Sequence, residues 1–184
     1  LGGRLDATSK IPNPIMTVIS SISYDHQEFL GNTIEKIAFE KSCMMKKHVP
    51  VIIGYQPYKE AKQILIDQAQ HRKCPTFIYG DNFFVSDDKD QLIYEDADNR
   101  IKFNKLKSHN GKFQIKNLAT AIATCLRLYK IDVKDFLKNN MHQNVYFPGR
   151  FEKLENHKLN KLISDQNELY LDGSHNQDGS KNIN

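Results

Sequence analysis

Apolar residues in the first eighty positions form short continuous runs that alternate with segments of helical spacing. The runs cover residues 15–22, 49–53 and 76–79 and predict buried strands, the first of them buried on both faces of a sheet. Between them, apolar residues recur every three or four positions over residues 33–47 and 58–72, which predicts two amphipathic helices. Because strands and helices alternate, this order favours a parallel sheet with crossover helices.

The first predicted helix carries a clear start signal. Asn32 or Thr33 can cap its N-terminus, and Glu35 is placed for a capping box. Two lysines, Lys46 and Lys47, suit its C-terminal end. The apolar side chains that would face the core are Ile34, Ile37, Ala38 and Met45.

The pattern changes after the third strand. Residues 92–95 and 101–106 flank the polar stretch 96–99, which predicts a β-hairpin. Helical spacing over residues 116–129 predicts a long helix, and residues 133–140 predict a shorter one. The core face of the long helix would consist of Leu118, Ala119, Ile122, Leu126 and Tyr129.

A break in the pattern lies near residue 147. Pro148 and Gly149 interrupt the chain, and short strands at residues 151–154 and 169–171 begin another unit. The sequence therefore predicts an α/β protein with one domain over residues 1–147 and the start of a second over residues 148–184.

Composition narrows the class of protein. Hydrophobic residues make up 39% of the 184 positions and charged residues 26%, so the chain can bury a core. The net charge of +4 is scattered, which argues against nucleic-acid binding, and no apolar run approaches the roughly 18 residues that cross a bilayer. Three distant cysteines, Cys43, Cys74 and Cys125, predict reduced, structural thiols and a cytoplasmic protein.

Two residues near the first strand could carry chemistry. His26 follows that strand, and ligands of open parallel sheets gather at the carboxyl ends of strands. A neutral imidazole there can bind a divalent metal, with Asp25 orienting the neighbourhood, and the alternative is a solvated loop histidine. Lys41 lies on the following helix, where the alternative is an ordinary solvated charge.

A second candidate group lies near the C-terminus. Arg150 follows the Pro-Gly break and could bind a phosphate or stack on a base, or it could be a surface residue of a hinge. Asp172 ends the last predicted strand and could accept hydrogen bonds from ribose hydroxyls, with His175 orienting a phosphate. The alternative for Asp172 and His175 is a plain strand-to-helix turn with an Asn cap.

The start of the long predicted helix is a third candidate. Gln114 and Asn117 open it, and free N–H groups there could face an anion or a base, unless Asn117 is only a cap. The sequence contains no phosphate-binding loop of the form G-x-x-x-x-G-K-[ST], no G-x-S-x-G elbow, no H-E-x-x-H and no cysteine zinc framework. An enzyme that uses ATP would need its phosphate cradle from outside these residues.

Six segments favour one interpretation through their order along the chain: GGRLDAT, SYDH, EFLGNTIEKIAFEK, QIKN, PGRFE and LDGSHNQDG. Together they resemble the folylpolyglutamate synthase/dihydrofolate synthase family of Mur-ligase-like ATP-dependent amide ligases. The resemblance covers nearly the whole chain, as an internal fragment. It implies that residues 1–147 belong to a Mur-ligase-like central ATPase domain, built as a mostly parallel sheet with helices. The phosphate loop of that domain is missing from this sequence. The same resemblance implies the start of a Rossmann-like C-terminal domain over residues 148–184.

The resemblance also implies roles for single residues. His26 is similar to a magnesium-binding histidine, and Lys41 is similar to a lysine that is carbamylated and so becomes an anionic ligand or positioner at the metal. The residues that resemble the family's ATP contacts are Asn117, Arg150, Asp172 and His175. Asp6 lies in a loop that the resemblance places near the substrate.

The reaction implied by the resemblance is an ATP-dependent ligation. A carboxylate of folate or dihydropteroate becomes an acyl phosphate, with Mg²⁺ bridging phosphate oxygens, and the amine of L-glutamate then displaces phosphate. We expect a monomer for the full-length enzyme and no activity from these 184 residues alone. Two other hypotheses are a non-catalytic remnant of a split or decayed gene and a cell-wall Mur-type ligase, against which PGRFE and LDGSHN argue.

Overall fold

The structure is a computed structural model, and it describes residues 2–4, 6–89, 91–105, 112–128, 132–139, 148–155, 158–164 and 166–181. Its first elements, with η for a 3₁₀ helix, are η1 (Ala7–Lys10), β1 (Thr17–Ile19), α1 (Gln27–Leu30), α2 (Ile34–Ser42), β2 (Val51–Ile53), α3 (Lys59–His71) and β3 (Thr76–Ile78). The next are β4 (Phe83–Asp88), β5 (Gln91–Asp96), β6 (Arg100–Asn104), α4 (Lys112–Arg127) and α5 (Val133–Lys138). The last are β7 (Glu152–Lys153), η3 (Lys158–Leu162), β8 (Tyr170–Leu171) and α6 (Gln177–Lys181).

The strands β1, β2 and β3 form a parallel sheet in that order, which confirms the topology predicted from alternating strands and helices. The central strand β2 is buried along its whole length. The prediction that the first strand is buried on both faces is wrong, because Val18 is 41% exposed. Val18 pairs with Ile52 and shares its face of the sheet; the helix on that face, α4, packs against β2 and leaves the edge strand open.

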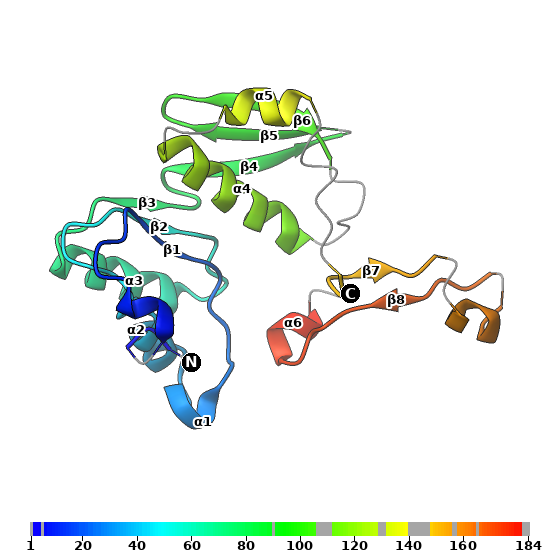
Figure 1. The fold of residues 1–184 in the computed structure, drawn as a ribbon, viewed down its shortest axis with the longest axis horizontal. Helices are drawn as coiled ribbons and strands as arrows, with labels where there is room; N and C mark the ends of the chain where they lie inside the picture. Colours follow the sequence, from blue (N-terminus) through cyan, green and yellow to red (C-terminus); the bar gives the residue numbers. More distant parts are fainter. Residues whose placement is uncertain are drawn as a thin grey trace.

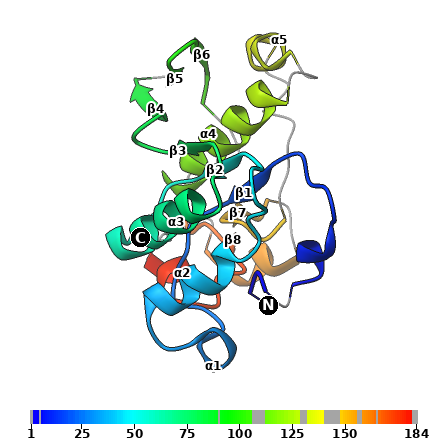
Figure 2. The same ribbon diagram turned by 90° about the vertical axis from the view of Figure 1, so that its left-hand side faces the viewer.

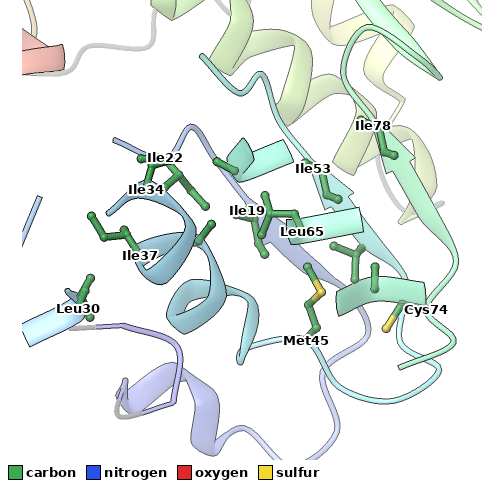
Figure 3. Packing of buried hydrophobic residues seen from close by; sticks show 14 residues of the cluster. Ile19, Ile22, Leu30, Ile34, Ile37, Met45, Ile53, Leu65, Cys74 and Ile78 are labelled. Carbon is green, nitrogen blue, oxygen red and sulfur yellow. The ribbon is translucent and has the colours of Figure 1, made fainter. Parts of the chain in front are cut away.

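The helices α2 and α3 cover the other face of this sheet, as Figures 1 and 2 show. Here they build the first hydrophobic core with Ile19, Ile53 and Leu65 (Figure 3). The four side chains predicted for the inner stripe of the first helix are all buried: Ile34, Ile37, Ala38 and Met45. Burial of a side chain of the size of isoleucine contributes about 1.5–3 kcal/mol, so this stripe fixes α2 on the sheet.

The start of α2 differs from the predicted capping box. Thr33 is the cap, and its hydroxyl accepts the N–H of Lys36 at 3.4 Å. The third helical residue is then Lys36 rather than Glu35, so the reciprocal carboxylate bond of a capping box does not form. The turn before α2 also contains the short helix α1, which the apolar pattern did not predict.

A second, antiparallel sheet contains β4, β5 and β6, and α4 lies between it and the parallel sheet (Figure 1). The pairing of β5 with β6 confirms the predicted hairpin, and α5 confirms the shorter helix over its described part. The strand β4 was not predicted, because Phe83 is buried but Phe84 beside it is exposed and acidic residues follow. Tyr94, Phe103 and Ile122 form part of the second core with Ile52 of β2.

The long helix α4 begins at Lys112, four residues before the predicted start. Gln114 therefore lies in its first turn and is buried, whereas Asn117 is the sixth helical residue and is exposed. The interpretation of Asn117 as a capping residue is wrong, because a residue in the second turn donates its N–H within the helix. Of the predicted core face, Ala119 and Ile122 are buried, Leu118 and Leu126 are partly buried, and Tyr129 lies outside the described residues.

Gly54 lets α4 approach the end of β2. A Cβ atom added at Gly54 would lie 2.9 Å from the hydroxyl oxygen of Thr120 and 3.3 Å from the carbonyl oxygen of Ile19. Both distances are below ordinary van der Waals contact. A side chain at this position would therefore force Thr120 of the helix to shift.

The hairpin carries a buried carboxylate at Asp96, which is 3% exposed. One of its oxygens accepts the Tyr94 hydroxyl at 2.8 Å and lies 3.7 Å from Nη1 of Arg127, and the other accepts the Asn99 amide. Burial by itself raises the pKa of Asp96, but the hydrogen bonds from Asn99 and Tyr94 and the charge of Arg127 outweigh it. The pKa is therefore below its ordinary value. Because Arg127 belongs to α4 and also stacks on Phe77, this network ties the hairpin to the helix.

The C-terminal segment (residues 148–181) forms its own small sheet, in which β7 and β8 pair antiparallel. This pairing confirms that both predicted strands exist. Leu159, Leu162 and Leu171 are exposed, so their apolar side chains lie uncovered. Residues 140–147 are outside the described chain, and the domain boundary at residue 147 stays a prediction.

We predict that Gly54→Ala lowers the free energy of unfolding by about 1–3 kcal/mol, the usual cost of overpacking a core. The physical reason is the contact of the new methyl group with Thr120. Chemical denaturation of the purified chain measures the change. The double variant Gly54→Ala/Thr120→Ala should recover part of the loss, and a fully additive pair would contradict the proposed contact.

We predict that Asp96→Asn costs about 3 kcal/mol of unfolding free energy at neutral pH, because it leaves a largely buried arginine without its counter-ion. The pKa of Asp96 is lowered in the folded state, so its contribution is full above the unfolded pKa and is lost as the pH falls through the folded pKa. The difference between wild type and variant should therefore shrink below about pH 4. Asp88→Asn, on the exposed end of β4, is the control and should change stability little; equal effects of the two variants would contradict the prediction.

Candidate functional site

The loop after β1 (residues 20–26, the strand-end loop) begins at the carboxyl edge of the parallel sheet. Gln56, just past β2, fixes the start of this loop, because its amide donates to the Ser20 carbonyl at 2.9 Å and accepts the Ile22 N–H at 3.0 Å. The Ile22 side chain is fully buried. The strand-end loop is therefore anchored at its base to the central strand, as expected for a ligand-binding loop on an open parallel sheet.

His26 ends this loop in a left-handed backbone conformation, with φ of 50° and ψ of 37°. Few residues other than glycine adopt this region, and it costs a side chain about 1–2 kcal/mol. The conformation starts α1, and the imidazole makes no capping hydrogen bond to it. Strained backbone of this kind is common at functional sites, but His48, Lys73, Lys89 and Phe151 share it, so His26 is a candidate because it lines the pocket.

Asp25 lies at the centre of the site. Its Oδ1 accepts the N–H of His26 at 2.8 Å, and its Oδ2 accepts the side-chain amide of Asn176 at 3.3 Å. The same Oδ2 lies 3.8 Å from Nε2 of His26 and 3.5 Å from Nε2 of His175. Partial burial raises the pKa of Asp25, but the His26 N–H, the two imidazoles and the Asn176 amide lower it by more, so the carboxylate stays ionised at neutral pH.

The opposite side of the site comes from the loop after β8. Asp172 accepts the N–H of Phe151 at 2.6 Å and the N–H of Ser174 at 2.7 Å, so it holds the two strands of the small sheet together at their ends. Burial raises the pKa of Asp172, but the Ser174 hydroxyl, the two N–H groups and the nearby Arg150 charge lower it below its ordinary value. Asp172 thereby positions the turn that carries His175.

His175 has a defined tautomer in its neutral form. Its Nδ1 lies 3.0 Å from the carbonyl oxygen of Gly173, which can only accept, so Nδ1 carries the proton. Neutral Nε2 is then a lone pair that faces the Asp25 carboxylate at 3.5 Å. A carboxylate oxygen and an imidazole nitrogen at this distance could bind a cation together.

A pocket of about 370 Å³ opens at this junction, within the usual size range of ligand sites. Its lining residues come from the strand-end loop, from α1 and from the loop after β8: Tyr24, Asp25, His26, Gln27, His175 and Asn176. The structure thus brings two predicted residues, His26 and His175, to one pocket although 149 positions separate them.

The other predicted site residues lie elsewhere. Lys41 is half-buried at the end of α2, and Asp172 supports the pocket without lining it. Asn117 and Arg150 are exposed, on α4 and before β7. Asp6 caps η1 and accepts both the N–H and the hydroxyl of Thr8, which lowers its pKa to about 2.

Contacts of neighbouring residues fix the backbone around Asn117 and Lys41. Next to Asn117, the ammonium group of Lys116 lies 3.3 Å from the ring centre of Tyr55, which holds α4 at the end of β2. At the end of α2, the N–H of Gly3 donates to the Glu40 carbonyl at 2.9 Å, and a Cβ at Gly3 would lie 2.7 Å from the Lys41 carbonyl. The N-terminal glycines thus pack directly on the helix end that carries Lys41.

Sequence reasoning did not name Gln27 and Tyr24 and gave Asp25 only an orienting role. It considered Asn176 only as a helix cap, and the structure confirms the cap, because Asn176 Oδ1 accepts the N–H of Gly179 in α6. The signal for Asp25 and Asn176 was present, since Asp25 precedes His26 in SYDH and Asn176 follows His175 in SHN. The contact between them joins residues 151 positions apart, and no local pattern can show it.

The donor groups of the pocket suit magnesium only if substrate phosphates complete its ligand shell. The pocket supplies one carboxylate, two imidazoles and two amides, and Mg²⁺ is commonly held by one or two carboxylates together with substrate phosphates. Within the described chain, no group of three or more His, Cys, Asp or Glu side chains is arranged to cage a metal ion. The same part of the chain contains no helix long and apolar enough to span a bilayer, and the three cysteines are free thiols.

Comparison with known proteins identifies the family. Residues 3–125 match the family model of the Mur ligase middle domain. The chain belongs to the Mur ligase family, on its folylpolyglutamate and dihydrofolate synthase branch. This confirms the resemblance carried by the six segments.

Individual relatives support this family assignment. The dihydrofolate synthase/folylpolyglutamate synthase of Bacillus subtilis is 29% identical over all of this chain and 42% of its own length. That of Haemophilus influenzae is 34% identical over 88% of this chain and 35% of its own length. The solved structure of E. coli FolC in complex with DHPP and ADP matches with a TM-score of 0.76 and 26% identity, over 98% of this chain and 39% of FolC. The chain thus spans less than half the length of these Mur ligase relatives.

We predict that His26→Gly leaves the unfolding free energy unchanged or raises it by up to about 1 kcal/mol, because glycine adopts the left-handed conformation freely. His26→Val should lower it by about 1–2 kcal/mol for the opposite reason. The matched control is His48→Gly, at φ of 65° and away from the pocket. Denaturant titration measures all three, and a clear loss of stability in His26→Gly would show that the imidazole stabilises the fold instead of serving chemistry.

Proposed function

We propose that this chain is part of an ATP-dependent amide ligase that adds L-glutamate to a carboxylate of folate or dihydropteroate through an acyl phosphate. The observation that carries the proposal is the shared pocket, which is lined by His26 of the strand-end loop and His175 of the C-terminal segment, both of them beside the Asp25 carboxylate. Family membership supports the ligase chemistry, and the ADP and DHPP complex of E. coli FolC supports a nucleotide and a folate-type substrate.

The residues divide into groups by their proposed roles. His26 would help to hold Mg²⁺ on the side of the parallel sheet, together with the phosphates of the nucleotide, and bound Mg²⁺ would neutralise phosphate charge. Lys41 lies outside the pocket lining and would act on the metal only after carbamylation turns its cation into an anionic group. His175 would face the phosphates from the C-terminal segment, and Asp172 would keep its turn in place. The remaining residues proposed as nucleotide contacts are Asn117 and Arg150, and Asp6 is proposed near the substrate.

The domain division fits this proposal. A first domain over residues 1–147 and a second over residues 148–184 would place the nucleotide at their junction, where the pocket lies. The sequence contains no G-x-x-x-x-G-K-[ST] loop, so these 184 residues offer no such cradle for the phosphates. We therefore propose that they bind nucleotide without completing the reaction.

We predict that the chain binds ADP in the presence of Mg²⁺, measured by isothermal titration calorimetry. His175→Ala should weaken binding roughly tenfold, which corresponds to about 1.4 kcal/mol. His71→Ala, on the exposed end of α3, is the control and should leave affinity unchanged. Failure of the wild-type chain to bind ADP would contradict the proposed nucleotide site.

Turnover tests the second half of the proposal. The purified chain should form no product from folate or dihydropteroate with ATP, Mg²⁺ and L-glutamate, because the phosphate-binding loop is not part of its sequence. Chromatographic separation of the glutamylated product measures this. ATP- and glutamate-dependent product above the background of a heat-denatured sample would overturn the prediction of inactivity.

A further inference from the structure

Asp25 divides its two oxygens between two parts of the molecule. Oδ1 is taken by the adjacent backbone N–H of His26 at 2.8 Å, so the side chain cannot rotate without losing that bond. This leaves Oδ2 directed at the C-terminal segment, where it accepts the Asn176 amide at 3.3 Å. Because the carboxylate is only 27% exposed, this bond is partly shielded from water.

Asn176 is fixed from its own side as well. Its Oδ1 accepts the N–H of Gly179 at 2.8 Å, at the start of α6, so its Nδ2 must be the atom that faces Asp25. A Cβ at Gly179 would lie 3.1 Å from the same Oδ1, which shows how closely the turn wraps around the amide. The Asn176 amide cannot turn over without losing the Gly179 bond, and either oxygen of the Asp25 carboxylate can only accept.

We propose that Asp25 is a positioning residue that holds the His175-Asn176 turn of the C-terminal segment against the strand-end loop, and so sets the distance between the two histidines of the pocket. The Asp25–Asn176 bond spans 151 positions and links the two predicted domains directly at the pocket. The contact stands on this geometry alone. Its effect on nucleotide affinity rests in addition on the proposed function.

Because Asn176 donates and Asp25 accepts, exchanging these two side chains tests the contact. In Asp25→Asn, Oδ1 keeps the His26 N–H, so the new NH₂ group would face the Asn176 NH₂ group, donor against donor. In Asn176→Asp, two carboxylate oxygens would face each other. In the double variant Asp25→Asn/Asn176→Asp, the amide and carboxylate are restored with reversed direction, and the net charge equals that of the wild type.

We expect each single variant to loosen the contact and the double variant to restore it. Small-angle scattering should show a larger radius of gyration for the single variants, and hydrogen exchange should be faster at residues 173–176 and 24–27. In titrations with ADP and Mg²⁺, each single variant should lose about five- to tenfold in affinity, and the double variant should recover to within about twofold of wild type.

The control is Glu28→Gln on α1, which removes the same charge close by but outside the pocket lining and should change none of these readouts. Single variants with wild-type scattering and exchange, or a double variant worse than either single one, would overturn the inference. If the wild type fails to bind ADP, the proposed function fails, and scattering and exchange still decide whether Asp25 makes this contact. A merely structural role would lower the stability of all variants in proportion, without rescue by the exchange.

Discussion

The close approach of α4 to β2 at Gly54 is the constraint on which the two sheets depend. The strand β2 belongs to both cores, since Val51 and Ile53 face α2 and α3 while Ile52 faces α4. The helix α4 in turn carries the antiparallel sheet on its other side (Figure 1). A side chain at Gly54 would therefore press on Thr120 in the helix that connects the two cores.

The candidate site derives its position from the same strand. Gln56 follows β2 by three residues and binds the base of the strand-end loop, while Tyr55 beside it receives the ammonium group of Lys116. The loop that carries His26 and the helix that carries Asn117 are thus both held by residues at the end of β2. A parallel sheet produces this arrangement because all of its strands end at one edge, so loops from distant parts of the sequence converge there.

Sequence patterns predicted those parts of the molecule in which burial alone decides the structure. The runs that became β2 and β3 and the stripe on α2 are apolar because they fill a core, and that signal is local. The pattern failed where neighbours decide: Val18 is apolar but lies on the edge strand, and β4 is a strand although one of its two phenylalanines faces solvent. The predicted start of α4 at residue 116 was four residues late, which misplaced Asn117 at its N-terminus. For the site, the motifs identified His26 and His175, whereas the bond between Asp25 and Asn176 could emerge only from the fold.

The strength of that bond indicates how the two parts of the molecule behave. A hydrogen bond to a charged group contributes about 1.5–3 kcal/mol, and the ordering of the two loops offsets part of it. This is too little to lock the C-terminal segment rigidly against the strand-end loop. If the two belong to separate domains, as predicted, a small polar interface of this kind generally permits relative motion. A ligand that contacts His26 and His175 together would add its own binding energy to the Asp25–Asn176 bond and stabilise the closed arrangement. In the proposed arrangement, the Asp25–Asn176 contact would align the two sides of the pocket, and a ligand bound between them would supply most of the free energy that holds them together.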